Sequence, residues 1–126
     1  MAEGWRRGAD AGRAGHLAGR AAEAAVERIY TDRGLTVAAR RWRGEGGEID
    51  LILRDGAALV FVEVKRSATH ARAAHALRPA QAARLMASAE AFAGAEPAGS
   101  LTEMRFDVAL VDGAGRVEIV ENALGP

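Results

Sequence analysis

The sequence predicts a single α/β domain, a mixed β-sheet flanked by helices in the order α-β-β-β-α-β-β. Three observations support this fold class. The chain has 126 residues, which is the length of about one domain. Apolar residues recur at helical spacing in some segments and in short β-type runs in others, the pattern of helices packed on a sheet. No internal repeat or linker divides the chain, so one core must serve every element.

The sequence of the N-terminal part predicts a tail followed by a helix. Residues 1–14 are rich in Gly, Ala and Arg without periodicity, so we expect a disordered tail before a domain that covers residues 15–126. A helix is expected from Leu17 to Arg33, and Gly34 is its stop signal. The predicted buried stripe of this helix comprises Ala22, Val26, Ile29 and Tyr30.

Three strands and a hairpin are expected next. The strands are predicted at residues 35–42, 48–54 and 58–65, with a Gly-rich bend at residues 44–47. Asp55-Gly56 is a strong signal for a two-residue hairpin turn. A turn centred on this dipeptide pairs Arg54 with Ala57. The remaining elements are a second helix at residues 78–93, a connector at residues 94–100, and strands at residues 104–111 and 116–120.

Composition excludes several classes of protein. The chain has no cysteine, which excludes disulfides and thiolate chemistry. It has no apolar run long enough to span a membrane and no secretory signal, so we expect a soluble cytoplasmic protein without a membrane partner. Net charge is zero, but basic residues dominate residues 1–44 and 66–84, on both sides of an acidic segment. This arrangement suits a phosphate backbone, and it also fits ordinary surface solvation.

Two carboxylates on the predicted hairpin are the candidate chemical site. In the predicted register Asp50 faces Phe61, and Glu63 lies one diagonal step away on the same sheet face. Two carboxylates and the main-chain carbonyl of Val64 suit Mg²⁺, for which Mn²⁺ can substitute. Lys65 is the only lysine among 17 basic residues, and its compact ammonium can orient a water molecule. Spacing alone leaves open the alternative that these are ordinary surface residues, with Lys65 paired to Glu63.

The blocks GGEIDLI, VFVEVK and MRFDVAL resemble the YraN family of small bacterial proteins within the PD-(D/E)XK nuclease superfamily. The resemblance runs from Gly19 to Asn122. It implies a restriction-endonuclease-like fold, similar to that of Holliday-junction resolvases, and metal-dependent hydrolysis of DNA phosphodiester bonds, including those of branched or recombination and repair intermediates. The candidate catalytic residues that it implies are Asp50 and Glu63 as metal ligands, Lys65 as the catalytic lysine, and Glu23 beside the metal.

DNA is therefore the expected partner. The candidate nucleic-acid contacts are Arg41, Arg43, Arg66, Arg72 and Gln81. Ala80 stands where the family has a lysine and Ser67 where it often has a basic residue, so this chain departs from the family pattern at these two positions.

Three alternatives stay open at this stage. The chain can be a DNA-binding or scaffolding protein that keeps the nuclease fold without turnover, or its carboxylates can be structural, buried against arginines. Glu23 can be a solvent-facing helix residue paired with a nearby arginine. A homodimer is expected only if the substrate is a symmetric junction cut on both strands. Asp107 is predicted to cap a polar network or to face solvent, without a catalytic role.

Overall fold

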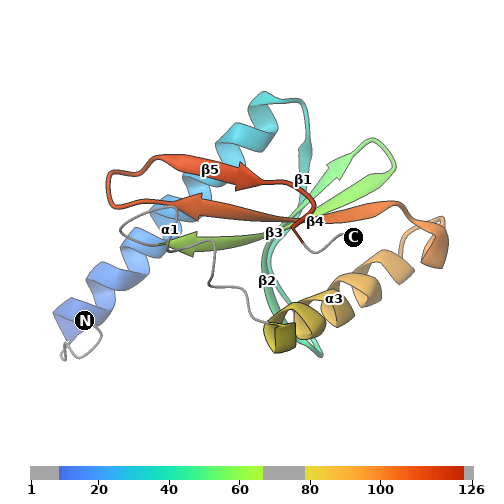
Figure 1. Cartoon of the computed structure of the whole chain (residues 1–126), viewed down its shortest axis with the longest axis horizontal. Coiled ribbons are helices and arrows are strands. Elements are labelled where there is room, and N and C mark those ends of the chain that lie inside the picture. Colours follow the sequence, from blue (N-terminus) through green and yellow to red (C-terminus); the bar gives the residue numbers. More distant parts are fainter. Residues whose placement is uncertain (1–8, 67–78, 124–126) are drawn as a thin grey trace.

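The computed structural model describes residues 9–66 and 79–123, with side chains from residue 19 onward. A five-stranded mixed sheet lies between two helices, α1 and α3, one on each face (Figure 1). The predicted fold class and element order are therefore confirmed. The elements are α1 (Ala9–Asp32), β1 (Thr36–Gly44), β2 (Gly47–Asp55), β3 (Ala58–Arg66), α3 (Pro79–Gly94), the 3-10 turn η2 (Gly99–Leu101), β4 (Met104–Val111) and β5 (Val117–Val120).

The strands follow one another across the sheet in chain order, β1-β2-β3-β4-β5. All neighbouring pairs are antiparallel except β3 and β4, which are parallel. A parallel pair requires a crossover connection, and α3 forms part of it on one face of the sheet. Residues 67–78 of that connection, which include Arg72, lie outside the described residues.

The first helix is longer than predicted. It begins at Ala9 rather than Leu17, so it overlaps the predicted tail at residues 9–14, while residues 1–8 lie outside the described part of the chain. The predicted stop is confirmed. Gly34 has φ +98°, and the Leu35 N–H donates to the Tyr30 carbonyl at 3.2 Å. A left-handed residue that closes the last turn in this way is a common helix end, and glycine adopts it without steric cost.

Apolar side chains cover both faces of the sheet. On the α1 face, Ala22, Val26 and Tyr30 of the helix pack on alternate residues of β2 and β3, and Ile29 is only partly buried. The strand residues of this cluster are Leu51, Leu53, Val60, Val62, Ala109 and Val111. The α3-face cluster comprises Ile49, Ile52, Leu59, Phe61, Leu85, Ala89, Ala93 and Phe106. Ile49 and Leu51 are two residues apart on β2 but lie on opposite faces, because strand alternation breaks between them.

The register of the central hairpin also differs from the prediction. Asp55 pairs with Ala58 and Leu51 with Val62, so the central turn residues are Gly56 and Ala57. Gly56 has φ +63°, as the first central position of a type II′ turn requires. The predicted turn instead put Asp55 in that position. Pairing is displaced by two residues, an even number, and an even displacement does not by itself move side chains from one face of the sheet to the other.

Helix α3 packs directly against the β1–β2 turn. A Cβ on Gly46 would clash with the Arg84 carbonyl oxygen, and one on Gly44 would lie 2.8 Å from Ser88 Oγ. Buried Ser88 donates a hydrogen bond to the Gly47 carbonyl at 3.0 Å. The Gly-rich bend predicted from the sequence is therefore a contact surface for α3, and this contact fixes the start of that helix near β3.

Trp42 lies at the edge of the α3-face cluster, where its ring meets Phe92 edge-on with centroids 5.2 Å apart. Within residues 9–66 and 79–123, neither helix combines the length and the apolar character of a membrane span.

Candidate metal and nucleic-acid site

Strands β2 and β3 separate at the point where Asp50 and Glu63 meet. The last paired rung is Leu51 with Val62, and the same register continued by one residue brings Asp50 opposite Glu63. The Asp50 side chain replaces the next ladder partner, because its Oδ2 accepts a hydrogen bond from the Val64 N–H at 2.8 Å. The N–H and carbonyl of a strand residue point to the same edge, so the Val64 carbonyl also points toward β2.

Side-chain alternation breaks in β1 and β2 on the same rung. Ile49 and its partner Trp42 pack on the α3 face, whereas Leu51 and its partner Arg40 lie on the α1 face. Between these two pairs the same register places Arg41 opposite Asp50. Arg41 has a backbone φ of +49°. A left-handed conformation costs a non-glycine residue about 1–2 kcal/mol, and such outliers concentrate at functional sites.

Glu63 is the most buried acidic side chain of the site. It keeps 9% of its surface exposed, and its Oε2 lies 3.5 Å from Lys65 Nζ and accepts a hydrogen bond from Gln81 Nε2 at 3.3 Å. The other oxygen, Oε1, is buried and receives no hydrogen bond. A buried carboxylate oxygen without a donor is unfavourable, and a bound cation is one way to satisfy it.

The two adjacent carboxyl groups shift each other's pKa in opposite directions, because Asp50 raises the pKa of Glu63 and a hydrogen bond with Glu63 lowers that of Asp50. Burial raises the pKa of Asp50, with the Val64 N–H opposing it and the Glu23 charge adding to it. Burial, followed by the neighbouring charge of Asp50, raises the pKa of Glu63 to about 7, against the effect of the Lys65 ammonium. Two adjacent carboxylates resist double ionisation unless a cation or a shared proton lies between them.

A pocket opens on each side of this pair. The α1-side pocket has a volume of about 550 Å³, and its described lining is Arg20, Glu23, Ala24, Glu27, Arg40, Arg41, Asp50 and Leu51. The α3-side pocket has a volume of about 190 Å³ and is lined by Gly46, Gly47, Glu48, Glu63, Gln81, Arg84 and Leu85. Asp50 therefore belongs to one pocket and Glu63 to the other, at the boundary between them.

Arginines of β1 pair with glutamates of α1 in the first pocket. Arg41 donates to Glu23 Oε1 through Nε at 3.0 Å and Nη2 at 2.6 Å. Arg40 donates to both oxygens of Glu27, at 2.8 Å each, and holds the pKa of Glu27 below its usual value. Glu23 thus pairs across to β1 and is not a solvent-facing residue paired within its helix.

The other expected DNA contacts lie around the pair. Gln81 binds Glu63 directly, and exposed Arg43 lies 3.5 Å from Glu48. Arg66 is exposed at the end of β3, and its guanidinium lies 3.9 Å from the Cβ position of Gly19 on α1. The structure therefore gathers Glu23, Arg41, Val64, Lys65 and Gln81 around Asp50 and Glu63.

The residues present fit one divalent cation with few protein ligands. Within the described ranges, no group of three acidic or histidine side chains lies close enough to hold a metal. Two carboxylates and a carbonyl match the needs of Mg²⁺, which keeps several waters, and the unsatisfied Glu63 Oε1 is one open ligand position.

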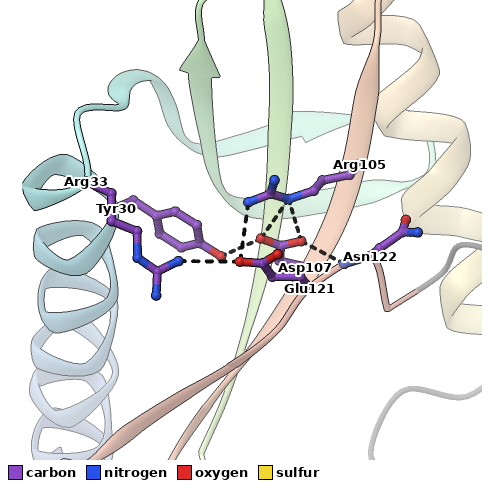
Figure 2. A network of polar contacts seen from close by, with 6 residues as sticks. All are labelled: Tyr30, Arg33, Arg105, Asp107, Glu121 and Asn122. Carbon is purple, nitrogen blue, oxygen red and sulfur yellow. Dashed lines mark hydrogen bonds and ion pairs between the residues drawn. The ribbon is translucent and has the colours of Figure 1, made fainter.

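A polar network that the sequence did not reveal lies elsewhere, beneath the end of α1 (Figure 2). Asp107 on β4 is fully buried and accepts hydrogen bonds from Tyr30 Oη at 2.7 Å, Arg105 Nε at 3.0 Å and the Asn122 N–H at 2.9 Å. Burial and this carboxylate raise the pKa of Tyr30 far above its usual value, so the phenol stays a donor. Asp107 therefore caps a network, one of the two predicted roles, and ties α1 to β4 and the C-terminal turn.

The fold and site define an α/β protein with two adjacent carboxylates and a lysine where a hairpin opens between two helices. The chain belongs to the uncharacterised protein family UPF0102, whose model matches residues 22–111. A UPF0102 protein of Ruegeria pomeroyi is 59% identical over 93% of this chain and 95% of its own length. One from Cereibacter sphaeroides is 56% identical over 89% of this chain and 96% of its own length. Family membership agrees with the resemblance to YraN proteins and defines no activity.

Proposed function

We propose that this protein is a metal-dependent nuclease of the PD-(D/E)XK type that hydrolyses phosphodiester bonds in nucleic acid, with DNA as the expected substrate. The observation that carries the proposal is the buried, unpartnered Glu63 Oε1 next to Asp50. A binding protein gains nothing from two such carboxylates near a phosphate backbone, because they repel it unless a cation lies between them.

Asp50, Glu63 and the Val64 carbonyl would hold Mg²⁺ or Mn²⁺. A divalent cation here supplies Lewis acidity toward the phosphate oxygens and lowers the pKa of a bound water. The Val64 N–H fixes Asp50 by donating to one carboxylate oxygen, so the other stays available. Gln81 and Lys65 hold Glu63 through Oε2, which leaves the buried Oε1 without a donor and available to a cation.

Lys65 is the proposed catalytic cation. Its ammonium lies 3.5 Å from Glu63 and its side chain is 21% exposed, so it can hold an attacking water or offset charge that develops on the phosphate. Arg84 lines the α3-side pocket and exposed Arg43 extends the basic surface near Glu48. These arginines are proposed to bind the nucleic-acid backbone, which carries no base-specific information.

The test is cleavage of a panel of DNA substrates: duplex, single strand, flap and four-way junction. Each is incubated with the purified protein in Mg²⁺, in Mn²⁺ and in EDTA, alongside the Asp50→Asn and Asp55→Asn variants. Asp55 is an exposed carboxylate on the same strand and serves as the matched control. We expect cleavage that needs the metal and Asp50 but not Asp55. Full metal-dependent cleavage by Asp50→Asn would refute the assignment.

The same assay also tests the main alternative, a DNA-binding protein without turnover. Salt-sensitive binding that Asp50→Asn leaves unchanged, with no cleavage of any substrate, would favour that alternative. It would also leave the two adjacent carboxylates without a role.

A further inference from the structure

The ion pair between Arg41 and Glu23 holds a third carboxylate beside the candidate metal site. Glu23 lines the same pocket as Asp50, yet both Arg41 donors contact Glu23 through the single atom Oε1. The adjacent pair is different, because Arg40 binds both oxygens of Glu27. Arg41 therefore donates to only one carboxylate oxygen of Glu23 and leaves Oε2 without a hydrogen bond from it, whereas Arg40 donates to both oxygens of Glu27.

We propose that Arg41 is a positioning residue that exchanges Glu23 for a phosphate group of the nucleic acid, and that this exchange releases Glu23 toward Asp50. The inference rests on the proposed function, since it adds a ligand to the metal position of that site. It implies that the three-carboxylate arrangement forms only when the substrate strand is in place. The free protein then holds the metal with two carboxylates.

A phosphate group can replace the Glu23 carboxylate at Arg41 because both are anions that fit the same guanidinium donors. A guanidinium binds carboxylate and phosphate oxygens with the same fork of donors. The described lining contributes three arginines, Arg20, Arg40 and Arg41, and three acids, Glu23, Glu27 and Asp50, so its formal charge is zero. A phosphate group can therefore bind to Arg41 if it replaces the carboxylate there.

The pocket suits a backbone phosphate better than a base. Its volume of about 550 Å³ lies within the range of small-ligand pockets. The residues described in its lining include no aromatic ring, and stacking on aromatic rings is the usual means of holding an unpaired base. The left-handed backbone of Arg41 places its guanidinium and that of Arg40 on the same side of the sheet, toward α1.

The proposed exchange predicts that removing the Arg41 guanidinium raises the affinity for Mn²⁺ and lowers the affinity for DNA. Arg41→Gln frees Glu23 in the absence of nucleic acid, so the affinity for Mn²⁺, measured by calorimetry, should rise roughly threefold to tenfold. The affinity for a fluorescein-labelled single-stranded DNA, measured in Ca²⁺, should fall, and its salt dependence should weaken by about one phosphate contact. A purely structural role would lower both affinities together.

Three variants make the test specific. Arg40→Gln removes an equal charge from the same pocket and should leave Mn²⁺ affinity within about twofold of the original protein. The double variant Glu23→Gln/Arg41→Gln should show no gain, because the released carboxylate is gone. Arg41→Asn repeats the test with a residue that tolerates the left-handed conformation, and thermal unfolding checks that each variant folds.

The outcomes separate this inference from the proposed function. If the original protein binds no Mn²⁺, or Asp50→Asn binds it equally well, the metal site itself is refuted. If Mn²⁺ binding depends on Asp50 but Arg41→Gln does not increase it, the exchange is refuted while the metal site stands. A gain that persists in the double variant would also overturn the exchange, because it would then reflect charge alone.

Discussion

Tyr30→Phe tests the buried network that joins α1 to the sheet. The substitution keeps the ring, which is fully buried, and removes the hydroxyl that donates to Asp107 Oδ2 at 2.7 Å. Asp107 would keep its contacts with Arg105 and Asn122 but lose one charge-assisted hydrogen bond in a site without water access. A hydrogen bond to a charged group contributes about 1.5–3 kcal/mol, so the free energy of unfolding should fall by that amount.

The expected loss is large enough to measure by thermal unfolding. With an unfolding entropy of about 2.1 cal/mol/K per residue, each kcal/mol corresponds to roughly 4 °C for a chain of 126 residues. Tyr30→Phe should therefore lower the Tm by about 6–12 °C. Circular dichroism at constant pH and salt is sufficient for the comparison.

Arg33→Gln is the matched control from the edge of the same network. Arg33 lies 3.5 Å from Glu121, and both side chains are about half exposed, at 49% and 55%. Exposed ion pairs contribute about 0–1 kcal/mol, so the Tm should change by no more than about 4 °C. If Arg33→Gln lowered the Tm as much as Tyr30→Phe, the reasoning would be contradicted, because the loss of stability would then not depend on burial of the interaction.

Three further predictions follow from the structure. Gly46→Ala should lower the free energy of unfolding in urea by about 1–3 kcal/mol, because the added Cβ would clash with the Arg84 backbone carbonyl, whereas Gly113→Ala, with no atom within 4 Å, should have little effect. In EDTA, stability should fall as pH rises from about 4.5 to about 7, because the folded protein raises the pKa of Glu63 to about 7 and so favours its protonated form; Glu63→Gln should flatten this dependence. Mg²⁺ should raise the Tm of the original protein at pH 8, and Asp50→Asn should abolish that increase.

The fold could be predicted because apolar periodicity determines each element locally. Val26 and Tyr30 at helical spacing and the run from Leu59 to Val62 each indicate an element without reference to the rest of the chain. The hairpin register was harder, since Asp55-Gly56 and Gly56-Ala57 are both possible turns. Both turns place Gly56 at a positive φ, and the first also requires a positive φ at Asp55, which is not among the positive-φ residues of the described chain.

The site was predicted in part. An even displacement of register kept Asp50 and Glu63 adjacent, so the central pair did not depend on the exact turn. The break in alternation at Arg41 and Asp50 could not be predicted, because an arginine gives no local signal for a left-handed backbone. The Tyr30–Asp107 bond joins residues 77 positions apart, and a pair so distant in the sequence leaves no trace in periodicity or spacing.

The most direct test of the central claim is a crystal structure of the protein grown in Mn²⁺ near pH 8, with an anomalous difference map. The account predicts a single peak between Asp50 and Glu63, in contact with the Glu63 oxygen that has no hydrogen bond and with the Val64 carbonyl. An empty position between two directly hydrogen-bonded carboxyl groups, in crystals that contain Mn²⁺, would contradict it.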